Sequence, residues 1–150
     1  MRPVEFRAML SIAGIVFTAA AGNEANDNDA EPSYPAGYLV SNVVSVAAID
    51  SSGNLASFSN FGQRTVSIGA PGVAIYSTAP NNSYTTLSGT SMATPHVTGA
   101  LALLFGQHPE FTPEQAIDRL LKSGNGTPSL VTTTRSQRRI DVGRMMYGEE

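Results

Sequence analysis

Short, unbroken apolar runs are the first pattern along this 150-residue chain. Residues 15–21 and 43–49 are continuous and partly β-branched, which is typical of strands buried on both faces of a parallel sheet. A shorter run at 66–68 predicts a strand that ends at the turn residues 69–72. Between the first two runs, residues 24–37 are polar and contain prolines, so they predict a surface loop.

A hairpin and a buried helix are predicted next along the chain. Residues 73–78 and 84–87 flank Pro80, Asn81 and Asn82 and predict a hairpin. From about Ser91 to Phe105 nearly every residue is small or apolar, which predicts a helix buried on all sides.

A second helix carries its own start and stop signals. Thr112 is a predicted N-cap, Pro113 suits the first turn, and Gln115 completes a capping box. Gly124 ends the helix, and its buried stripe is Ile117, Leu120 and Leu121. Strands alternating with helices predict an α/β fold with a largely parallel sheet, of a length that suits one domain.

The start of the chain has two readings. Arg2 and Arg7, the apolar run 8–21 and its small residues at 19–21 could be a secretory signal. Alternatively, a short helix to about Ser11, ended by Gly14 in the left-handed conformation, leads into the first strand. The residue pattern alone leaves both readings open.

Composition narrows the classes of function. Hydrophobic residues make up 41% of the chain and charged residues 14%, which favours a folded core. A net charge of -3 does not recommend nucleic acid as a partner, and the arginines clustered after position 134 predict a solvated terminal element. The chain has no cysteine, so it has no disulfide or thiol chemistry. No apolar run reaches 18 residues, so we expect no membrane span.

The segment Leu87 to Phe105, LSGTSMATPHVTGALALLF, carries the candidate chemistry. Ser91 falls where the predicted helix begins, beside unpaired backbone N–H groups and the positive end of the helix dipole. Those N–H groups could stabilise the oxyanion formed when the hydroxyl attacks a carbonyl. The alternative is that Ser91 merely caps the helix.

The run Gly-Thr-Ser-Met-Ala-Thr-Pro-His closely resembles the nucleophile segment of the subtilisin-like serine proteases. Ala20-Ala21-Gly22-Asn23-Glu24 is similar to the oxyanion-asparagine segment of that family. Other segments match the family less specifically and in the same order along the chain: Tyr34-Pro35-Ala36, the strand 43–49 with Asp50, Phe58 to Gly62, and Gly69 to Val73. Residues 139–142 match more weakly. The resemblance therefore runs from about Gly14 to Leu121.

The resemblance implies a three-layer subtilisin-like α/β fold with a mainly parallel sheet. Residues 1–150 would be its C-terminal half, a partial catalytic domain. The resemblance favours a strand over a secretory signal for residues 15–21. Asn23 then lies at the carboxyl end of that strand, where such sheets bind ligands. Glu5 and Phe6 also fit a signal peptide poorly.

The resemblance also implies roles for individual residues. Ser91 would be the nucleophile, and the Asn23 amide with the Ser91 N–H would hold the oxyanion, supported by the Thr90 hydroxyl. Met92 would be sensitive to oxidation. The residues expected to contact substrate are Ala20, Ala21, Gly22, Ser33 and Gly89.

A general base is not evident in the sequence. His96 lies five residues after Ser91, about 140° around the predicted helix, and His108 lies past its far end, some 25 Å away. Neither can reach the Ser91 hydroxyl, and Asp50 is expected to be a turn residue. In the family the aspartate and histidine precede the asparagine segment, so we expect this chain alone to be inactive.

A metal site finds little support. Read as an EF-hand from Asp27, the sixth position is Pro32 and the twelfth is Tyr38, where glycine and glutamate are needed. Relatives often bind a structural cation through backbone carbonyls near residues 34–36, but acidic support is absent around Thr65 and Ser67. We expect no cofactor for the chemistry; a structural Ca²⁺ is not readable from sequence.

Two functions remain. The first is a serine endopeptidase whose partners are a peptide or protein substrate and the missing N-terminal half of the catalytic domain, without nucleic acid or membrane. The resemblance implies a secreted parent enzyme. The second is a non-catalytic, peptide-binding or pseudoenzyme remnant of the same fold.

Overall fold

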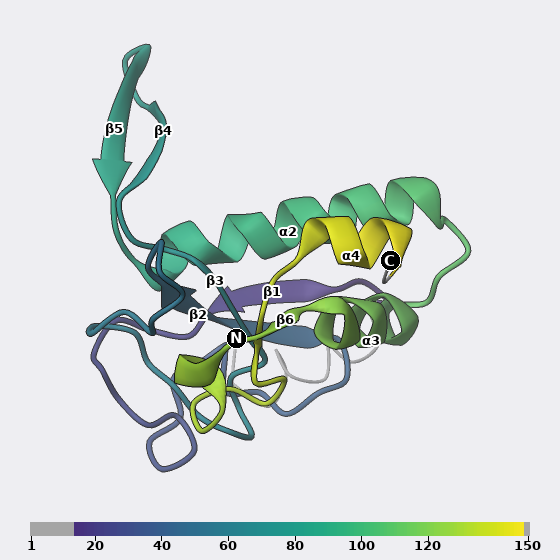
Figure 1. The fold of residues 1–150 in the computed structure, drawn as a ribbon, viewed down its shortest axis with the longest axis horizontal. Coiled ribbons are helices and arrows are strands. Elements are labelled where there is room, and N and C mark those ends of the chain that lie inside the picture. The colour runs from purple at the N-terminus through teal and green to yellow at the C-terminus, as the bar shows by residue number, and fades with distance from the viewer. Residues whose placement is uncertain (1–13, 149–150) are drawn as a thin grey trace.

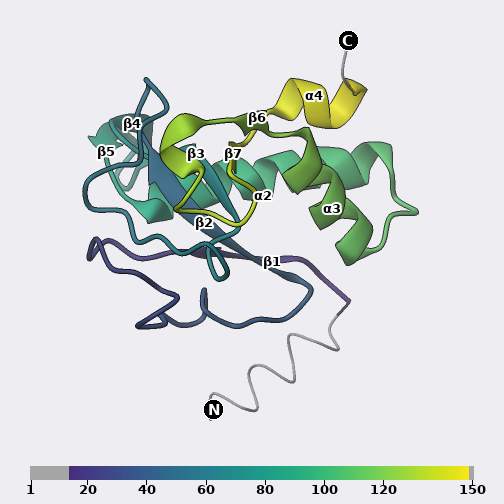
Figure 2. The same cartoon turned by 60° about the horizontal axis from the view of Figure 1, so that its bottom comes forward.

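The computed structural model describes residues 14–148, and its centre is a five-stranded sheet. The strands lie in the order β1-β2-β3-β7-β6. The first four are parallel, and β6 runs antiparallel to β7. The strand bounds are β1 Phe17–Ala20, β2 Val43–Ile49, β3 Ile68–Pro71, β6 Asn125–Gly126 and β7 Arg138–Arg139. Figure 2 shows β1 along one border of the sheet and β6 and β7 toward the other. The predicted α/β class with a mainly parallel sheet is confirmed.

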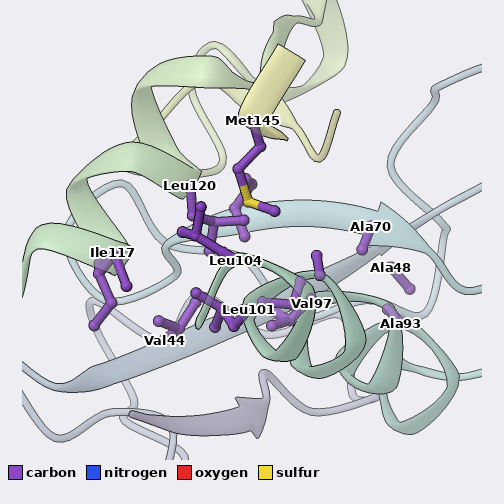
Figure 3. Packing of buried hydrophobic residues seen from close by; sticks show 14 of the residues in the cluster. Val44, Ala48, Ala70, Ala93, Val97, Leu101, Leu104, Ile117, Leu120 and Met145 are labelled. Carbon is purple, nitrogen blue, oxygen red and sulfur yellow. The ribbon is translucent and has the colours of Figure 1, made fainter. Parts of the chain in front are cut away.

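Three helices pack against one face of this sheet: α2 (Thr90–Gln107), α3 (Pro113–Ser123) and α4 (Val142–Tyr147). Alternate residues of β2 point toward them, because side chains of a strand alternate between its two faces. Val44 and Val46 thus join a buried cluster with Val97 and Leu104 of α2 and Leu120 of α3 (Figure 3). This cluster fixes α2 along the sheet.

The opposite face of the sheet carries a smaller core. Ala47 of β2 packs there with Ala21 and Val66, and Leu55 covers the group. Loops rather than helices supply the remaining cover, and a short 3₁₀ turn, η1 (Pro128–Leu130), lies among them. The third layer implied by the resemblance contains no helix within residues 14–148.

Several predicted elements are confirmed. Strand β2 has the predicted bounds, and α2 covers the predicted buried helix with small extensions. Helix α3 begins with the predicted capping box between Thr112 and Gln115. The predicted hairpin forms as β4 (Ile75–Ala79) and β5 (Ser83–Leu87), which project from the body of the protein (Figure 1). The third strand is displaced, because β3 begins only at Ile68.

Two predictions of complete burial are wrong. Strand β1 is only half-buried, because it pairs with β2 on one side and is the end strand of the sheet among residues 14–148. Ile15, just before it, is 57% exposed. Helix α2 buries the face that contains Ala93, Val97 and Leu101, whereas Leu103 is 57% exposed. The apolar sequence of α2 surrounds the whole helix, but the described chain covers only one of its faces.

The two ends of the described chain give mixed results. Gly14 has the predicted positive φ of 63°, but the helix expected before it lies outside residues 14–148. The predicted solvation of the C-terminal arginines is wrong for three of them, because Arg138, Arg139 and Arg144 are each partly buried. Arg138 donates to the Gly124 carbonyl and Arg144 to the Asn125 side chain, and both are partly buried. No helix in the described part of the chain is long and apolar enough to cross a membrane.

Candidate active site

Ser91 lies in the first turn of α2, at the end of the helix closest to the β4–β5 hairpin. The N-cap residue is Gly89, which has no side-chain cap, so the alternative in which Ser91 merely caps the helix is wrong. Ser91 is exposed, and its hydroxyl makes no hydrogen bond within residues 14–148. The first turn contains no acidic residue, so the positive end of the 18-residue helix dipole is not offset there.

Asn23 follows β1 by three residues and reaches across to the start of α2. Its side-chain oxygen accepts two hydrogen bonds from Thr90, one from the backbone N–H at 2.9 Å and one from the hydroxyl at 3.0 Å. Because the oxygen is held in this way, the side-chain Nδ2 is left as a donor on an exposed residue. Segments 67 positions apart in the sequence are thereby joined beside Ser91.

Thr90 is fully buried and makes one further contact. Its hydroxyl oxygen accepts a hydrogen bond from the Gly22 N–H at 3.2 Å. Since the single hydroxyl proton is directed at the Asn23 oxygen, Thr90 orients the asparagine and does not point a donor away from it. Gly89 is also adjacent: a Cβ placed there would lie 3.7 Å from the Asn23 side-chain nitrogen.

The residues predicted to contact substrate lie in different surroundings in the structure. Ala20 and Gly22 are half-buried beside Asn23, but the Ala21 side chain is wholly buried in the smaller core. The Ala21 side chain therefore does not face the Asn23 side of the strand, because strand alternation turns it to the opposite face. Ser33 lies in the loop after Asn23, where its carbonyl accepts from the Gly37 N–H at 2.6 Å. No contact within the described residues joins Ser33 to Ser91.

A groove of about 400 Å³ lies between the β4–β5 hairpin and the first turns of α2. Ser91 and Met92 line it on the helix side, and Tyr76 and Leu87 line it on the hairpin side. The Tyr76 ring stacks on Tyr84 with centroids 5.4 Å apart. The sequence predicted the hairpin but not that it forms a wall next to Ser91. Another hollow of about 420 Å³, between α3 and α4, is lined by charged side chains and by none of the predicted site residues.

Both histidines have hydrogen-bond partners other than Ser91, although His96 lines the same groove as Ser91. The His96 Nδ1 donates to the Met92 carbonyl at 2.9 Å, and the His108 Nδ1 lies 3.2 Å from the Glu110 carboxylate. Neither hydrogen-bonds to Ser91, as predicted. Asp50 is a turn residue, also as predicted: hydrogen bonds from the backbone and side chain of Asn54 lower the pKa of its carboxyl group.

Two buried asparagines near the site were missed by the sequence analysis. Asn28 is fully buried although it lies in the predicted surface loop, and Asn60 is 1% exposed. Their side chains bond to each other at 3.0 Å and to the backbone around Asn23. For Asn28 the signal in the sequence was an unusual density of Asn and Asp in residues 23–29, which equally suits a solvated loop. Asn60 lies in the segment Phe58 to Gly62, which was noted only as a match to the family.

The hollow beside residues 34–36 has no carboxylate residue among its lining residues. This hollow, of about 250 Å³, is lined by Ala36, Thr65 and Ser67 and also by the side chains of Arg64 and Arg135. A hard cation takes oxygen ligands, so only backbone carbonyls and hydroxyls of these residues could supply them here. Among the described residues there is also no cluster of three acidic, histidine or cysteine side chains that could hold a metal.

The nearby Asp29 carboxylate binds the protein instead. It accepts from the Arg64 and Thr65 backbone N–H groups and from the Thr65 hydroxyl at 2.7 Å. Burial alone would raise the pKa of Asp29. The hydrogen bonds from Thr65 and Arg64, with the Arg64 charge, outweigh burial and lower the pKa. Asp29 thus ties the loop after β1 to the loop before β3.

The fold and this geometry define an α/β protein with an exposed serine at a helix N-terminus and an asparagine amide beside it. Residues 5–140 match the model of the subtilase family, described as Peptidase S8. The chain is 46% identical over 114 residues to subtilisin-like protease 2 of Plasmodium falciparum, covering 73% of this chain and 8% of that protein. It is 47% identical over 108 residues to subtilisin DY of Bacillus licheniformis, covering 71% and 38%. It is also 45% identical over 120 residues to a thermostable alkaline protease of Halalkalibacterium halodurans, covering 79% of this chain and 32% of that protein.

The chain belongs to the subtilase family of serine proteases. The resemblance inferred from the motifs is thereby confirmed at the level of the family. The aligned part spans between 8% and 38% of the length of these three relatives.

Proposed function

We propose that this chain supplies the nucleophile and the oxyanion hole of a serine endopeptidase catalytic domain. The observation that carries the proposal is the fixed Asn23 side chain. Its oxygen accepts two hydrogen bonds from Thr90, so its Nδ2 donor is free to face a substrate at Ser91.

In this mechanism the Ser91 oxygen attacks the scissile carbonyl carbon, and the carbonyl oxygen becomes an oxyanion. The Asn23 Nδ2 and the Ser91 backbone N–H donate to that oxyanion, and the dipole of α2 stabilises its charge. The serine proton must pass to a base, which in turn needs an orienting group. Neither histidine of this chain serves, so the aspartate and histidine are contributed by protein outside residues 1–150.

The remainder of the catalytic domain is therefore the main proposed partner. An apolar groove of about 390 Å³ between β1 and α2 supports this, because Ile15, Val16, Leu101 and Phe105 line it. Strand β1, which is the end strand of the sheet within residues 14–148, and the exposed apolar face of α2 adjoin the groove. Additional strands and helices packed there would cover apolar surface that soluble proteins rarely leave exposed.

The substrate is proposed to be a peptide or protein chain. Ala20 and Gly22 would form a wall for the side chain that precedes the cut, and Gly89 lies beside them; their small size leaves room for a large apolar group. Ser33 would contribute from the loop. Ala21 contributes through its position in the backbone and not through its side chain.

Complementation tests the proposal. The chain is mixed with a subtilisin N-terminal part that carries the aspartate and histidine, and turnover of a peptide p-nitroanilide is measured. We expect activity in the mixture and none from the purified chain alone, since Ser91 without a base remains a neutral alcohol. A serine-directed fluorophosphonate should label Ser91 in the mixture only.

Two variants make the result specific. Ser91→Ala should abolish labelling and turnover. Ser88→Ala is the matched control, because Ser88 is an exposed serine nearby whose oxygen only accepts from the Ala74 N–H; it should retain both. Activity that survives in Ser91→Ala would disprove the assignment of the nucleophile. A folded, docked mixture that binds peptide without labelling would favour the non-catalytic alternative.

A further inference from the structure

Asn23 sits in a turn that leaves regular strand geometry. Gly22 has a φ of 116° and Ala25 a φ of 54°, so the backbone after β1 cannot continue the ladder of the sheet. The polar backbone groups of such a turn need other partners when they are buried. Two asparagine side chains, both almost completely buried, supply them.

Asn60 holds the turn from one side. Its side-chain oxygen accepts from the Glu24 N–H at 2.8 Å and from the Asn26 N–H at 3.1 Å, and its own backbone N–H donates to the Gly22 carbonyl at 3.0 Å. A Cβ at Gly22 would collide with the Asn60 side-chain nitrogen, so the side chain lies directly against the turn. The residues on both sides of Asn23 are thus bonded to Asn60.

Asn28 completes the arrangement. Its Nδ2 donates to the Ala21 carbonyl at 2.7 Å, and its oxygen accepts from the Asn60 Nδ2 at 3.0 Å. Both polar atoms of each side chain therefore have partners, and no water is needed to satisfy them. A residue with a donor and an acceptor at once is required at both positions, and aspartate, leucine or alanine cannot replace that pair of functions.

We propose that Asn28 and Asn60 are positioning residues for the oxyanion donor, fixing the backbone that carries Asn23; this rests on the function proposed for Asn23. Thr90 fixes the end of the Asn23 side chain, and the asparagine pair fixes its Cα. Neither Asn28 nor Asn60 contacts substrate. Their effect on catalysis passes through the place of the Asn23 amide, which must match the oxyanion of the transition state.

The test uses the complete catalytic domain, this chain together with the part that carries the aspartate and histidine. Asn60→Ala should lower kcat by about 10-fold to about 100-fold, the scale on which a displacement of about 1 Å acts. KM should change less than about twofold, because the substrate wall remains. In an Asn23→Ala background the same substitution should have no further effect on kcat, since the donor that it positions is gone.

Asn42→Ala is the matched control. Asn42 is 3% exposed and its Nδ2 donates to the Ile15 carbonyl at 2.9 Å, so it bonds the backbone before β1 as Asn28 bonds the backbone after it. Its loss should lower stability and leave the kcat of the folded enzyme unchanged. If Asn60→Ala fails to fold, Asn60→Asp is put through the same cycle, because aspartate keeps both acceptor bonds and replaces the donor to Asn28 with a second acceptor oxygen.

Each outcome of these measurements either supports or overturns the positioning role of Asn28 and Asn60. An equal loss of kcat in the presence and absence of Asn23, or no loss at all, overturns the proposal. A loss that disappears in the Asn23→Ala background supports it. A retained rate in Ser91→Ala or an undiminished kcat in Asn23→Ala would instead disprove the proposed function, so the two failures are distinguishable.

Discussion

Replacing Thr90 with valine separates two ways in which its hydroxyl can serve the oxyanion hole. Valine keeps the shape of threonine and keeps the backbone N–H bond to Asn23. It removes the hydroxyl bond to the Asn23 oxygen and the acceptor of the Gly22 N–H, at 3.0 Å and 3.2 Å. Thr90 is fully buried, Gly22 is half-buried and Asn23 is exposed, so water can replace only part of these two bonds.

The magnitude follows from these two bonds. The Gly22 N–H without a partner costs at most about 1–3 kcal/mol, and the lost side-chain bond contributes about 0.5–1.5 kcal/mol, so the free energy of unfolding should fall by at most about 1.5–4.5 kcal/mol. If only the bond that orients Asn23 matters in the transition state, kcat should fall by about 2-fold to 13-fold. Removing the asparagine donor of subtilisin, a relative, costs on the order of 10²–10³ in turnover, and that value is carried over for Asn23→Ala.

The assay is steady-state turnover of a peptide p-nitroanilide by the complete catalytic domain, with urea unfolding monitored in parallel. Thr90→Ser is the control, because serine retains the hydroxyl and should retain most of the rate. A loss in Thr90→Val as large as that in Asn23→Ala would refute the reasoning. It would mean that the Thr90 hydroxyl turns away from Asn23 and donates to the oxyanion itself.

Three further predictions concern stability and surface. Asp29→Asn should destabilise the domain at pH 7. Because its folded-state pKa lies below the ordinary 3.8, that contribution is present above about pH 3.8 and lost as the pH falls through the lowered value; a difference in urea midpoint that stays constant down to pH 3 would contradict this. Gly72→Ala places a Cβ 2.6 Å from that of Ala48 and 2.9 Å from the Gly89 carbonyl, and should cost about 1–3 kcal/mol. In Gly99→Ala, on α2, the added Cβ meets no atom within 4 Å, so the free energy of unfolding should rise by about 0.5–1 kcal/mol. Equal urea midpoints for Gly72→Ala and Gly99→Ala would contradict the close contacts described around Gly72. The isolated chain should bind a hydrophobic dye and aggregate, and Leu103→Lys should reduce both; a sharp thermal transition from a dye-free monomer would show that the exposed face of α2 does not matter.

Local patterns in the sequence were sufficient for much of the fold. The continuous apolar run of β2 and the capping residues Thr112 and Gln115 specify their elements through neighbours in the chain, so their bounds could be predicted. The burial of β1 and α2 could not be predicted in this way, because it depends on which other parts of the protein cover them. An apolar residue such as Leu103 has the same character whether or not a partner lies over it.

The candidate site was predictable where it rests on contiguous motifs. Ser91 and Asn23 each stand in a specific run of residues, and the structure brings them together through Thr90. The hydrogen bond between the Asn28 and Asn60 side chains joins positions 32 residues apart. The residues around one asparagine do not indicate that the other is its partner. Asparagine suits turns and solvated loops as readily as buried networks.

The β4–β5 hairpin has a consequence for how specificity could be changed in this protein. Its base is closed by a backbone bond from the Gly89 N–H to the Gly72 carbonyl at 2.8 Å, and its strands are mostly exposed along their length. Residues 73–88 therefore form a replaceable cassette whose two ends are fixed next to Ser91. The entropic cost of closing a loop grows by only about 0.6 kcal/mol for each doubling of its length. Hairpins of other lengths and sequences can be grafted between Gly72 and Gly89 to reshape one wall of the groove while the nucleophile and its asparagine partner stay where they are.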